Sequence, residues 1–194
     1  MFRIDEEAPG QSGAREALLD RVFGPARFAR TSERLRQGRL PELALAAADG
    51  GELVGTLRLW AVTAGFRHTA LLLGPLAVDP GRQGEGIGAR LMRSALNRAA
   101  VAGHGAVLLV GDAPYYARFG FSAALTEGLE LPGPVERHRF LGHELRAGVL
   151  QGAHGLVRPA GVLQPAVALP WQGEAELARH QPAHQPLVIH PPLN

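Results

Sequence analysis

A glycine-rich turn between an apolar run and the longest amphipathic segment constrains the fold of this chain most strongly. Residues 69–78 form the apolar run, which ends at an Asp-Pro-Gly sequence and is followed by Gly84, Gly86 and Gly88. Residues 87–102 repeat apolar side chains at intervals of four, which predicts an amphipathic helix. The short apolar run 106–110 is typical of a strand buried on both faces. We therefore expect the helix to cross between two parallel, neighbouring strands.

The segment before residue 69 predicts helices followed by an antiparallel hairpin. Residues 14–23 have the pattern of an amphipathic helix, and residues 31–37 form a shorter helical segment. Residues 43–48 and 52–62 have strand character and flank Asp49-Gly50-Gly51, a strong hairpin signal. The order of elements predicts a single mixed α/β domain.

The composition changes beyond Gly161, where proline interrupts any hydrophobic period. The prolines of this segment are Pro165, Pro170, Pro182, Pro186, Pro191 and Pro192. We expect a domain over residues 1–161 and a proline-rich tail over residues 162–194, flexible or draped on the domain.

The amino-acid composition excludes several classes of chemistry. The 194-residue chain contains no cysteine, so it has no disulfides, thiolate metal sites or cysteine nucleophile. All 20 basic residues are arginine, which excludes a covalent mechanism on lysine. The arginines look scattered, so nucleic-acid binding is a weak alternative. No apolar run spans a membrane and no signal peptide opens the chain, so we expect a cytoplasmic protein that binds no membrane. His180, His184 and His190 are too loosely spaced to predict a metal site.

The glycine-rich turn suits a phosphate-bearing ligand. A helix N-terminus has unpaired N–H groups and a partial positive charge, and glycine lets a ligand approach the backbone closely. Arg82 offers a charge-assisted bond to the same phosphate. The spacing fits neither a dinucleotide-binding fingerprint nor a Walker loop, which requires a lysine. A tight strand-to-helix connection without any ligand is the plain structural alternative.

Two segments together carry a resemblance to a known family. Gln83-Gly84-Glu85-Gly86-Ile87-Gly88 matches the Gln/Arg-x-x-Gly-x-Gly/Ala signature of the GNAT superfamily of acyl-CoA-dependent N-acyltransferases. Residues 111–121 resemble the later segment of that family, in which a short helix with a tyrosine runs into Gly-Phe. The amino-acid sequence of this segment is similar to that of the YhbS-like bacterial branch of the family. The resemblance covers residues 1–161 and implies a central mixed, mostly antiparallel sheet flanked by helices.

The resemblance also implies a cofactor and residue roles. Acetyl-CoA would be the co-substrate, without a metal, and the acceptor would be a small-molecule or peptide amine. The backbone of Leu76, Ala77 and Val78 would pair with the pantetheine arm, and the Val78 N–H would stabilise the oxyanion. Tyr116 would protonate the departing thiolate. Arg82 and the amides of the turn would hold the pyrophosphate, the latter being Gln83, Gly84, Glu85, Gly86, Ile87, Gly88 and Ala89.

Several alternatives stay open at this point. Adjacent helical positions diverge by about 100°, so we expect at least one of Tyr115 and Tyr116 to be structural. Asp112 fits a helix N-cap better than a catalytic base. Residues 69–78 contain no carboxylate that could act as a general base for the amine. Three alternatives remain: the amine binds in its neutral form, it loses its proton to a chain of water molecules, or the protein is not a catalyst. Residues 66–68 and 131–139 are candidate substrate loops.

These observations lead to one functional expectation and one rival. We expect an N-acyltransferase, most simply an N-acetyltransferase, in which an amine attacks acetyl-CoA directly in a ternary complex. The rival is a non-catalytic acyl-CoA-binding sensor, which needs the pyrophosphate turn but no acid. The sequence leaves the acceptor and the choice between monomer and homodimer open.

Overall fold

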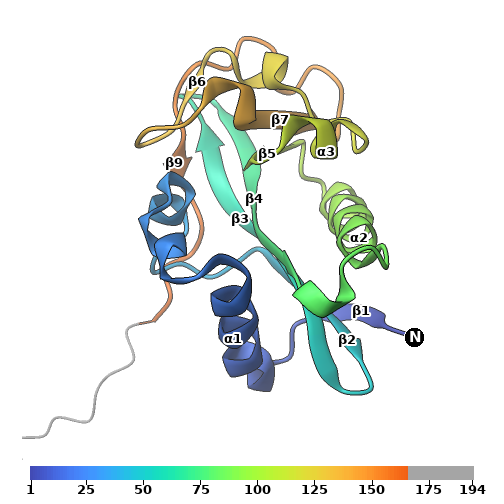
Figure 1. Ribbon diagram of the computed structural model, residues 1–194. Helices are drawn as coiled ribbons and strands as arrows, with labels where there is room; N and C mark the ends of the chain where they lie inside the picture. The colour runs from blue at the N-terminus through green and yellow to red at the C-terminus, as the bar shows by residue number, and fades with distance from the viewer. Residues whose placement is uncertain (166–194) are drawn as a thin grey trace, which may run out of the picture. The chain divides into compact units, whose positions relative to one another are not determined.

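A mixed sheet with helices on both faces forms the protein (Figure 1). The computed structural model describes residues 1–165, and Met1–Gln164 form one compact unit. The helices are α1 (Ser12–Phe23), α2 (Ile87–Val101) and α3 (Ala113–Ala117). The strands are β1 (Arg3–Glu6), β2 (Leu43–Asp49), β3 (Glu52–Ala64), β4 (His68–Val78), β5 (Ala106–Val110), β6 (Leu129–Glu130), β7 (Phe140–Glu144), β8 (Gly155–Leu156) and β9 (Arg158–Pro159).

The main sheet has the order β1-β2-β3-β4-β5-β7. Every neighbouring pair in this order is antiparallel except β4 and β5, which are parallel and connected through α2. β9 adds to β3 beyond the end of β2. The fold class predicted from the sequence is therefore confirmed, including the parallel pair around the long helix.

β4 and β5 separate soon after they meet. Their pairing is limited to Leu71 with Val107 and Leu72 with Leu108, whereas β4 continues to Val78. On its other side, β4 has a bulge against β3, because Leu57 pairs with Leu76 and Leu59 with Leu73. Gly74 lies in this bulge, and its carbonyl accepts a hydrogen bond of 2.6 Å from the Trp60 indole. The sheet is thus open between the carboxyl-terminal half of β4 and the end of β5.

α1 and α2 cover opposite faces of the sheet (Figure 1). Leu18 and Leu19 of α1 pack against Ala77 of β4. Ile87 and Leu91 of α2 pack so closely on Gly55 of β3 that a Cβ there would lie 2.9 Å and 3.0 Å from their methyl groups. Because successive strand residues face opposite sides, β3 and β4 present one face to each helix. None of the helices within residues 1–165 is long and apolar enough to cross a membrane.

Two kinds of element differ from the sequence expectation. The short helical segment at residues 31–37 is a 3₁₀ helix, η3 (Thr31–Leu35), and a second one, η2 (Pro25–Ala29), precedes it. The sequence analysis missed β1, β6, β7, β8 and β9. β1 is a charged edge strand with a largely exposed pattern, so it lacks the alternation that identifies a strand.

The segment before the proline-rich part is bonded to the domain. Leu40 N–H donates to the Val162 carbonyl, and Gln164 N–H donates to the Gly38 carbonyl, both at 2.9 Å. The compact unit therefore extends to Gln164, past the position 161 proposed from composition. The rest of the expected tail, residues 166–194, lies outside the described residues.

We predict that a chain ending at Gln164 keeps the fold and the melting temperature of the full chain. A chain ending at Gly161 should remain folded but lose about 1–3 kcal/mol, because it lacks these two backbone hydrogen bonds, worth about 0.5–1.5 kcal/mol each. Thermal denaturation of the three chains measures both effects. A large drop in melting temperature for the chain ending at Gln164 would show that later residues stabilise the domain.

Candidate active site

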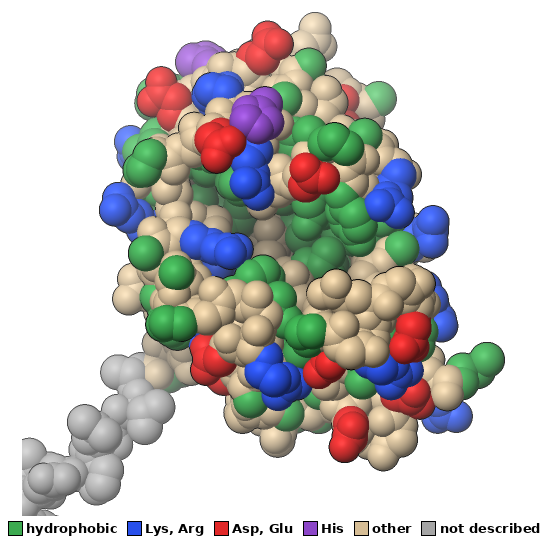
Figure 2. Space-filling view, in the orientation of Figure 1, with side chains coloured by type: hydrophobic (Ala, Val, Ile, Leu, Met, Phe, Trp, Pro, Cys, Tyr) green, Lys and Arg blue, Asp and Glu red, His purple; other side chains and the backbone are tan. Residues whose placement is uncertain are grey.

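A cavity of about 870 Å³ opens beside the separated end of β4. One wall comes from α1, η2 and η3, and the other from β4, β5 and α3. In Figure 2 this face is hollowed near its centre, with hydrophobic side chains inside and basic side chains on the rim. Of the predicted catalytic and cofactor-binding residues, Leu76, Gln83 and Tyr116 line the cavity, whereas Ala77, Val78, Arg82, Gly84, Glu85, Gly86, Ile87, Gly88 and Ala89 do not.

The open edge of β4 presents backbone groups to the space between the strands. Asp79 N–H donates to the Val54 carbonyl at 2.9 Å, so Asp79 pairs toward β3. Because bonding alternates along an antiparallel pair, Ala77 also faces β3, whereas Leu76 and Val78 direct their N–H and C=O groups to the opposite edge. β5 pairs with β4 only at Leu71 and Leu72. The polar backbone groups of Leu76 and Val78 therefore have no strand partner within residues 1–165.

The backbone N–H groups in the first turn of α2 likewise lack hydrogen-bond acceptors among residues 1–165. The first bond into the helix runs from Arg90 N–H to the Gly86 carbonyl at 3.0 Å. No acceptor within the described part of the chain bonds the N–H groups of Ile87, Gly88 and Ala89, and no side chain caps the helix. Gly84 and Gly86 have φ of 87° and 77°, and a Cβ on either would point into open space. The turn thus exposes a row of backbone donors at the positive end of the helix.

Arg82 is bound by carboxylates. Its Nε donates to Glu85 at 2.6 Å, and its Nη2 donates to Asp49 at 2.9 Å. The Arg82 bond is the main reason why the pKa values of Glu85 and Asp49 lie below their ordinary values. These bonds leave the Nη1 donors of Arg82 free of partners among residues 1–165. Arg82 therefore braces the turn against β2 in this structure.

α3 places two tyrosines at the cavity. Asp112 caps the helix by accepting a bond from Tyr115 N–H at 3.3 Å, which confirms the predicted cap. The rings of Tyr115 and Tyr116 meet edge to face, with centroids 4.9 Å apart. Both tyrosines line the cavity, so their divergence along the helix does not separate them, and the expectation that at least one of them is structural stays a prediction.

Two glycines fix the positions of these rings. A side chain at Gly111 would overlap the Tyr116 ring, and a Cβ at Gly88 would lie 3.1 Å from the Tyr115 hydroxyl. Tyr115 therefore touches the first turn of α2, and Tyr116 lies against the end of β5. A five-residue helix that packs on both elements lets adjacent side chains reach one cavity.

Tyr116 is the group whose titration the site changes most clearly. Burial raises the pKa of Tyr116 to about 12, with smaller contributions in the same direction from Tyr115 and Asp112. The positive charge of Arg139 acts in the opposite direction. The phenol therefore stays protonated throughout the physiological pH range.

The carboxylates that line the cavity all have partners. Glu33 binds Arg36 at 2.7 Å. Although burial acts to raise it, hydrogen bonds from Arg27 and Arg15 hold the pKa of Glu16 below its ordinary value. Asp112 is engaged as the α3 cap. Glu52, Asp79 and Glu85 do not line the cavity. No group of three or more His, Cys, Asp or Glu side chains within residues 1–165 is placed to hold a metal ion.

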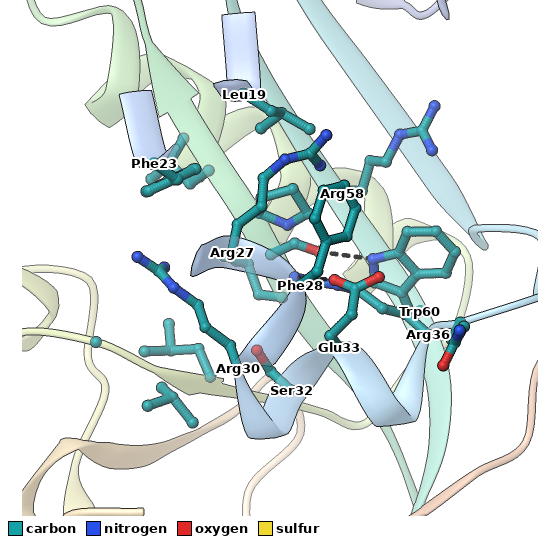
Figure 3. Close-up of a pocket in the computed structure, with 18 of the residues that line it drawn as sticks. Leu19, Phe23, Arg27, Phe28, Arg30, Ser32, Glu33, Arg36, Arg58 and Trp60 are labelled. Carbon is teal, nitrogen blue, oxygen red and sulfur yellow. Dashed lines mark hydrogen bonds and ion pairs between the residues drawn. The ribbon is translucent and has the colours of Figure 1, made fainter. Parts of the chain in front are cut away.

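The sequence analysis missed an arginine cluster in the cavity wall (Figure 3). We define this cluster as the seven arginines that line the cavity, namely Arg15, Arg27, Arg30, Arg36, Arg39, Arg58 and Arg139. The arginines looked scattered along the chain, but the fold brings these seven together. A signal was present, because five arginines occur between residues 27 and 39. Of the two candidate substrate loops, residues 66–68 line a separate cavity, whereas residues 131–139 supply Arg139.

Comparisons with known proteins agree on one family. A family model described as an acetyltransferase (GNAT) domain matches residues 41–123. The chain is 31% identical over 156 residues to the uncharacterized N-acetyltransferase YhbS of Escherichia coli K12, covering 79% of this chain and 93% of YhbS.

Solved structures give the same result. The crystal structure of E. coli YhbS in complex with CoA is similar with a TM-score of 0.72 and 30% identity, covering 82% of this chain and 89% of that one. A GNAT family acetyltransferase from Brucella melitensis, in complex with acetyl-CoA, has a TM-score of 0.54 and 29% identity, covering 74% and 96%.

Proposed function

This chain belongs to the GNAT family of acetyltransferases, and on that premise we propose that it transfers an acetyl group from acetyl-CoA to an acceptor amine in its main cavity. The observation that carries the proposal is that three features lie at or beside the main cavity. These are the open edge of β4, the uncapped N-terminus of α2 and the protonated phenol of Tyr116. The CoA and acetyl-CoA in the two related crystal structures support the choice of cofactor.

In this proposal the cofactor follows the backbone from α2 to the tyrosines. The N–H groups of the turn, from Gln83 to Ala89, bind the pyrophosphate, because charged acceptors are favoured at a helix N-terminus. The free Nη1 of Arg82 adds a donor there. The pantetheine amides pair with Leu76 and Val78 and extend along the stretch that contains Ala77, where β4 lacks a strand neighbour. This path leads the thioester into the cavity beside Tyr116.

The chemistry is a direct displacement at the thioester carbonyl. The nitrogen lone pair of a neutral amine attacks the carbonyl carbon and forms a C–N bond, and the carbonyl oxygen becomes an oxyanion. The N–H of Leu76, the open-edge β4 residue that lines the cavity, donates to this oxyanion, which leaves the Leu76 C=O and the backbone groups of Val78 for the pantetheine amides. The C–S bond then breaks, and the electron pair stays on the CoA sulfur, while the nitrogen loses its extra proton to water.

Tyr116 stabilises the departing thiolate mainly by hydrogen bonding. A thiol has a pKa of about 8.5 by analogy with cysteine, well below the value of about 12 for Tyr116. Full proton transfer from the phenol to the thiolate is therefore uphill, by on the order of 5 kcal/mol. A charge-assisted hydrogen bond to the developing thiolate carries no such cost. The contribution of Tyr116 should therefore lie at the lower end of the range for positioned acids.

The first prediction tests the pyrophosphate site by substituting Gly86. Gly86→Asp adds a carboxylate in the open space before α2, where it would repel the pyrophosphate. Calorimetry should show at least a 10²-fold loss of acetyl-CoA affinity, because hydrogen bonds to charged groups contribute about 1.5–3 kcal/mol each. Acetyl-pantetheine, which lacks the pyrophosphate, should bind wild type and variant equally.

Gly103→Asp is the matched control for this change. Gly103 has φ of 86° and open space beside it, and it follows the opposite end of α2. The Gly103→Asp substitution thus introduces similar backbone strain and the same charge far from the proposed site. The acetyl-CoA affinity of this variant should stay near that of the wild type. Equal loss in both variants would assign the effect to folding, and normal binding by Gly86→Asp would remove the pyrophosphate from this turn.

The second prediction separates the two tyrosines. Tyr116→Phe keeps the buried ring but removes the hydroxyl, and kcat should fall about 10²-fold while acetyl-CoA affinity changes little. Tyr115→Phe should affect kcat much less. Steady-state release of free CoA thiol measures both. A crippled Tyr115→Phe enzyme beside an unaffected Tyr116→Phe enzyme would transfer the acid role to Tyr115.

The third prediction concerns pH, because the lining carboxylates are all engaged in bonds. If the amine arrives neutral without an enzyme base, log kcat/KM should rise with pH up to a pKa that follows the acceptor. No descending limb should appear up to about pH 10, since Tyr116, with a pKa of about 12, remains protonated. Two acceptors of different basicity provide the measurement. An ascending limb with the same pKa for both acceptors would instead reveal an enzyme base.

A further inference from the structure

The arginine cluster carries more positive charge than its carboxylate partners neutralise. Four of its members form ion pairs: Arg15 and Arg58 with Glu7, Arg15 and Arg27 with Glu16, Arg27 with Asp20, and Arg36 with Glu33. Arg39 donates to the Gly161 carbonyl. Seven guanidinium groups line this cavity, and with Asp112 included the carboxylates that line it or pair with them number five, namely Glu7, Glu16, Asp20, Glu33 and Asp112.

Arg30 and Arg139 have no carboxylate partner among residues 1–165. Both side chains line the main cavity and also an adjoining cavity of about 660 Å³, and Ser32 is shared in the same way. Arg30 lies over the Phe23 ring at 4.6 Å, which supports its stem and leaves its donors without a bound acceptor in this part of the chain. Two guanidinium groups from distant segments thus flank the junction of the two cavities.

The charges of Arg30 and Arg139 each affect the pKa of another side chain that lines the main cavity. Burial lowers the pKa of the Arg36 guanidinium, Glu33 opposes this effect, and the charges of Arg30 and Arg27 lower it further. Arg139 in turn acts on Tyr116. Mutual repulsion of this kind is unfavourable in an empty cavity, and a bound anion offsets it.

We infer that the acceptor is a small amine that also carries an anionic group, a carboxylate or a phosphate, which Arg30 and Arg139 bind at the junction of the two cavities. Guanidinium groups recognise both anions through paired N–H donors. The amine then extends from this anchor toward Tyr116 and the thioester. The acceptor is a small molecule because it shares one cavity of about 870 Å³ with the end of the pantetheine arm. This inference rests on the proposed acetyl transfer and adds the chemical class of the acceptor.

The test compares acceptors that differ only in charge. 4-Aminobutanoate and 4-aminobutanamide have nearly the same shape, and 3-aminopropylphosphonate replaces the carboxylate by a phosphoryl group. Thiol release with the full chain gives kcat/KM for each, and calorimetry with the CoA-bound protein gives their affinity without turnover. We expect one of the anionic amines to exceed the amide at least 10-fold in both measurements, with the difference shrinking as salt is added.

Arg30→Gln and Arg139→Gln should each reduce that preference about 10- to 100-fold, the range expected for a lost charged hydrogen bond. Their kcat/KM for the uncharged amide should fall much less than for the anionic amines, and their KM for acetyl-CoA should stay near wild type. Arg30→Lys and Arg139→Lys should restore part of the preference. Arg158→Gln is the control, because Arg158 is an exposed arginine on β9 that lines no part of either cavity.

Four results would overturn the inference. The first is equal binding of anionic and uncharged amines to the wild type, and the second is an unchanged preference in both glutamine variants. The third is a higher KM for acetyl-CoA in those variants with every acceptor. The fourth is a higher kcat/KM for acidic peptides than for any small amine. The third result would assign the arginines to the cofactor phosphates. A separate result would contradict the proposed acetyl transfer itself, namely that an anionic amine binds to the CoA-bound protein but no thiol is released with acetyl-CoA.

Discussion

The separation of β4 from β5 is the constraint on which the site depends. After Leu72 and Leu108 the strands no longer pair, so the edge of β4 keeps polar backbone groups that a continuous sheet would consume. Such groups are costly when buried without partners. A ligand with amide groups of its own can satisfy them. The open edge of β4 and the two tyrosines of α3 reach one cavity there, and Tyr115 also contacts the first turn of α2 at Gly88, so the helix N-terminus lies beside this cavity.

The cavity combines two kinds of recognition that depend on different parts of the chain. At the α2 end, backbone N–H groups act, and the glycines there matter for their φ angles and for the space they leave open. At the opposite end the proposal uses side chains, and the arginines there come from η2, η3, β3 and η6 (Arg137–Arg139). Backbone recognition suits the constant part of a cofactor, whereas side chains adapt to one particular acceptor. Tyr116 lies where the two meet, and its titration responds to both Asp112 and Arg139.

The parts that the sequence predicted are those set by local pattern. The period of four in α2, the turn beside Asp49 and the short apolar run of β5 each identified an element, and the glycine spacing identified the turn before α2. The arginine cluster could not be derived in this way. Arg58 and Arg139 join Arg27 and Arg30 only through strand pairing and the η6 turn, which are long-range contacts. β1 was missed for a related reason, since its pairing with β2 rather than its own pattern makes it a strand.

The arginine cluster also bears on how the acceptor loses its proton. A bound ammonium group beside several guanidinium groups is disfavoured, so its pKa falls and the neutral, nucleophilic amine becomes more abundant. The same charges attract the anionic group of the acceptor, which fixes the amine in the field of the cluster. An acceptor with both groups would therefore be captured by one end and activated at the other. The engaged state of Glu16, Glu33 and Asp112 is consistent with this arrangement, because no carboxylate then needs to act as a base.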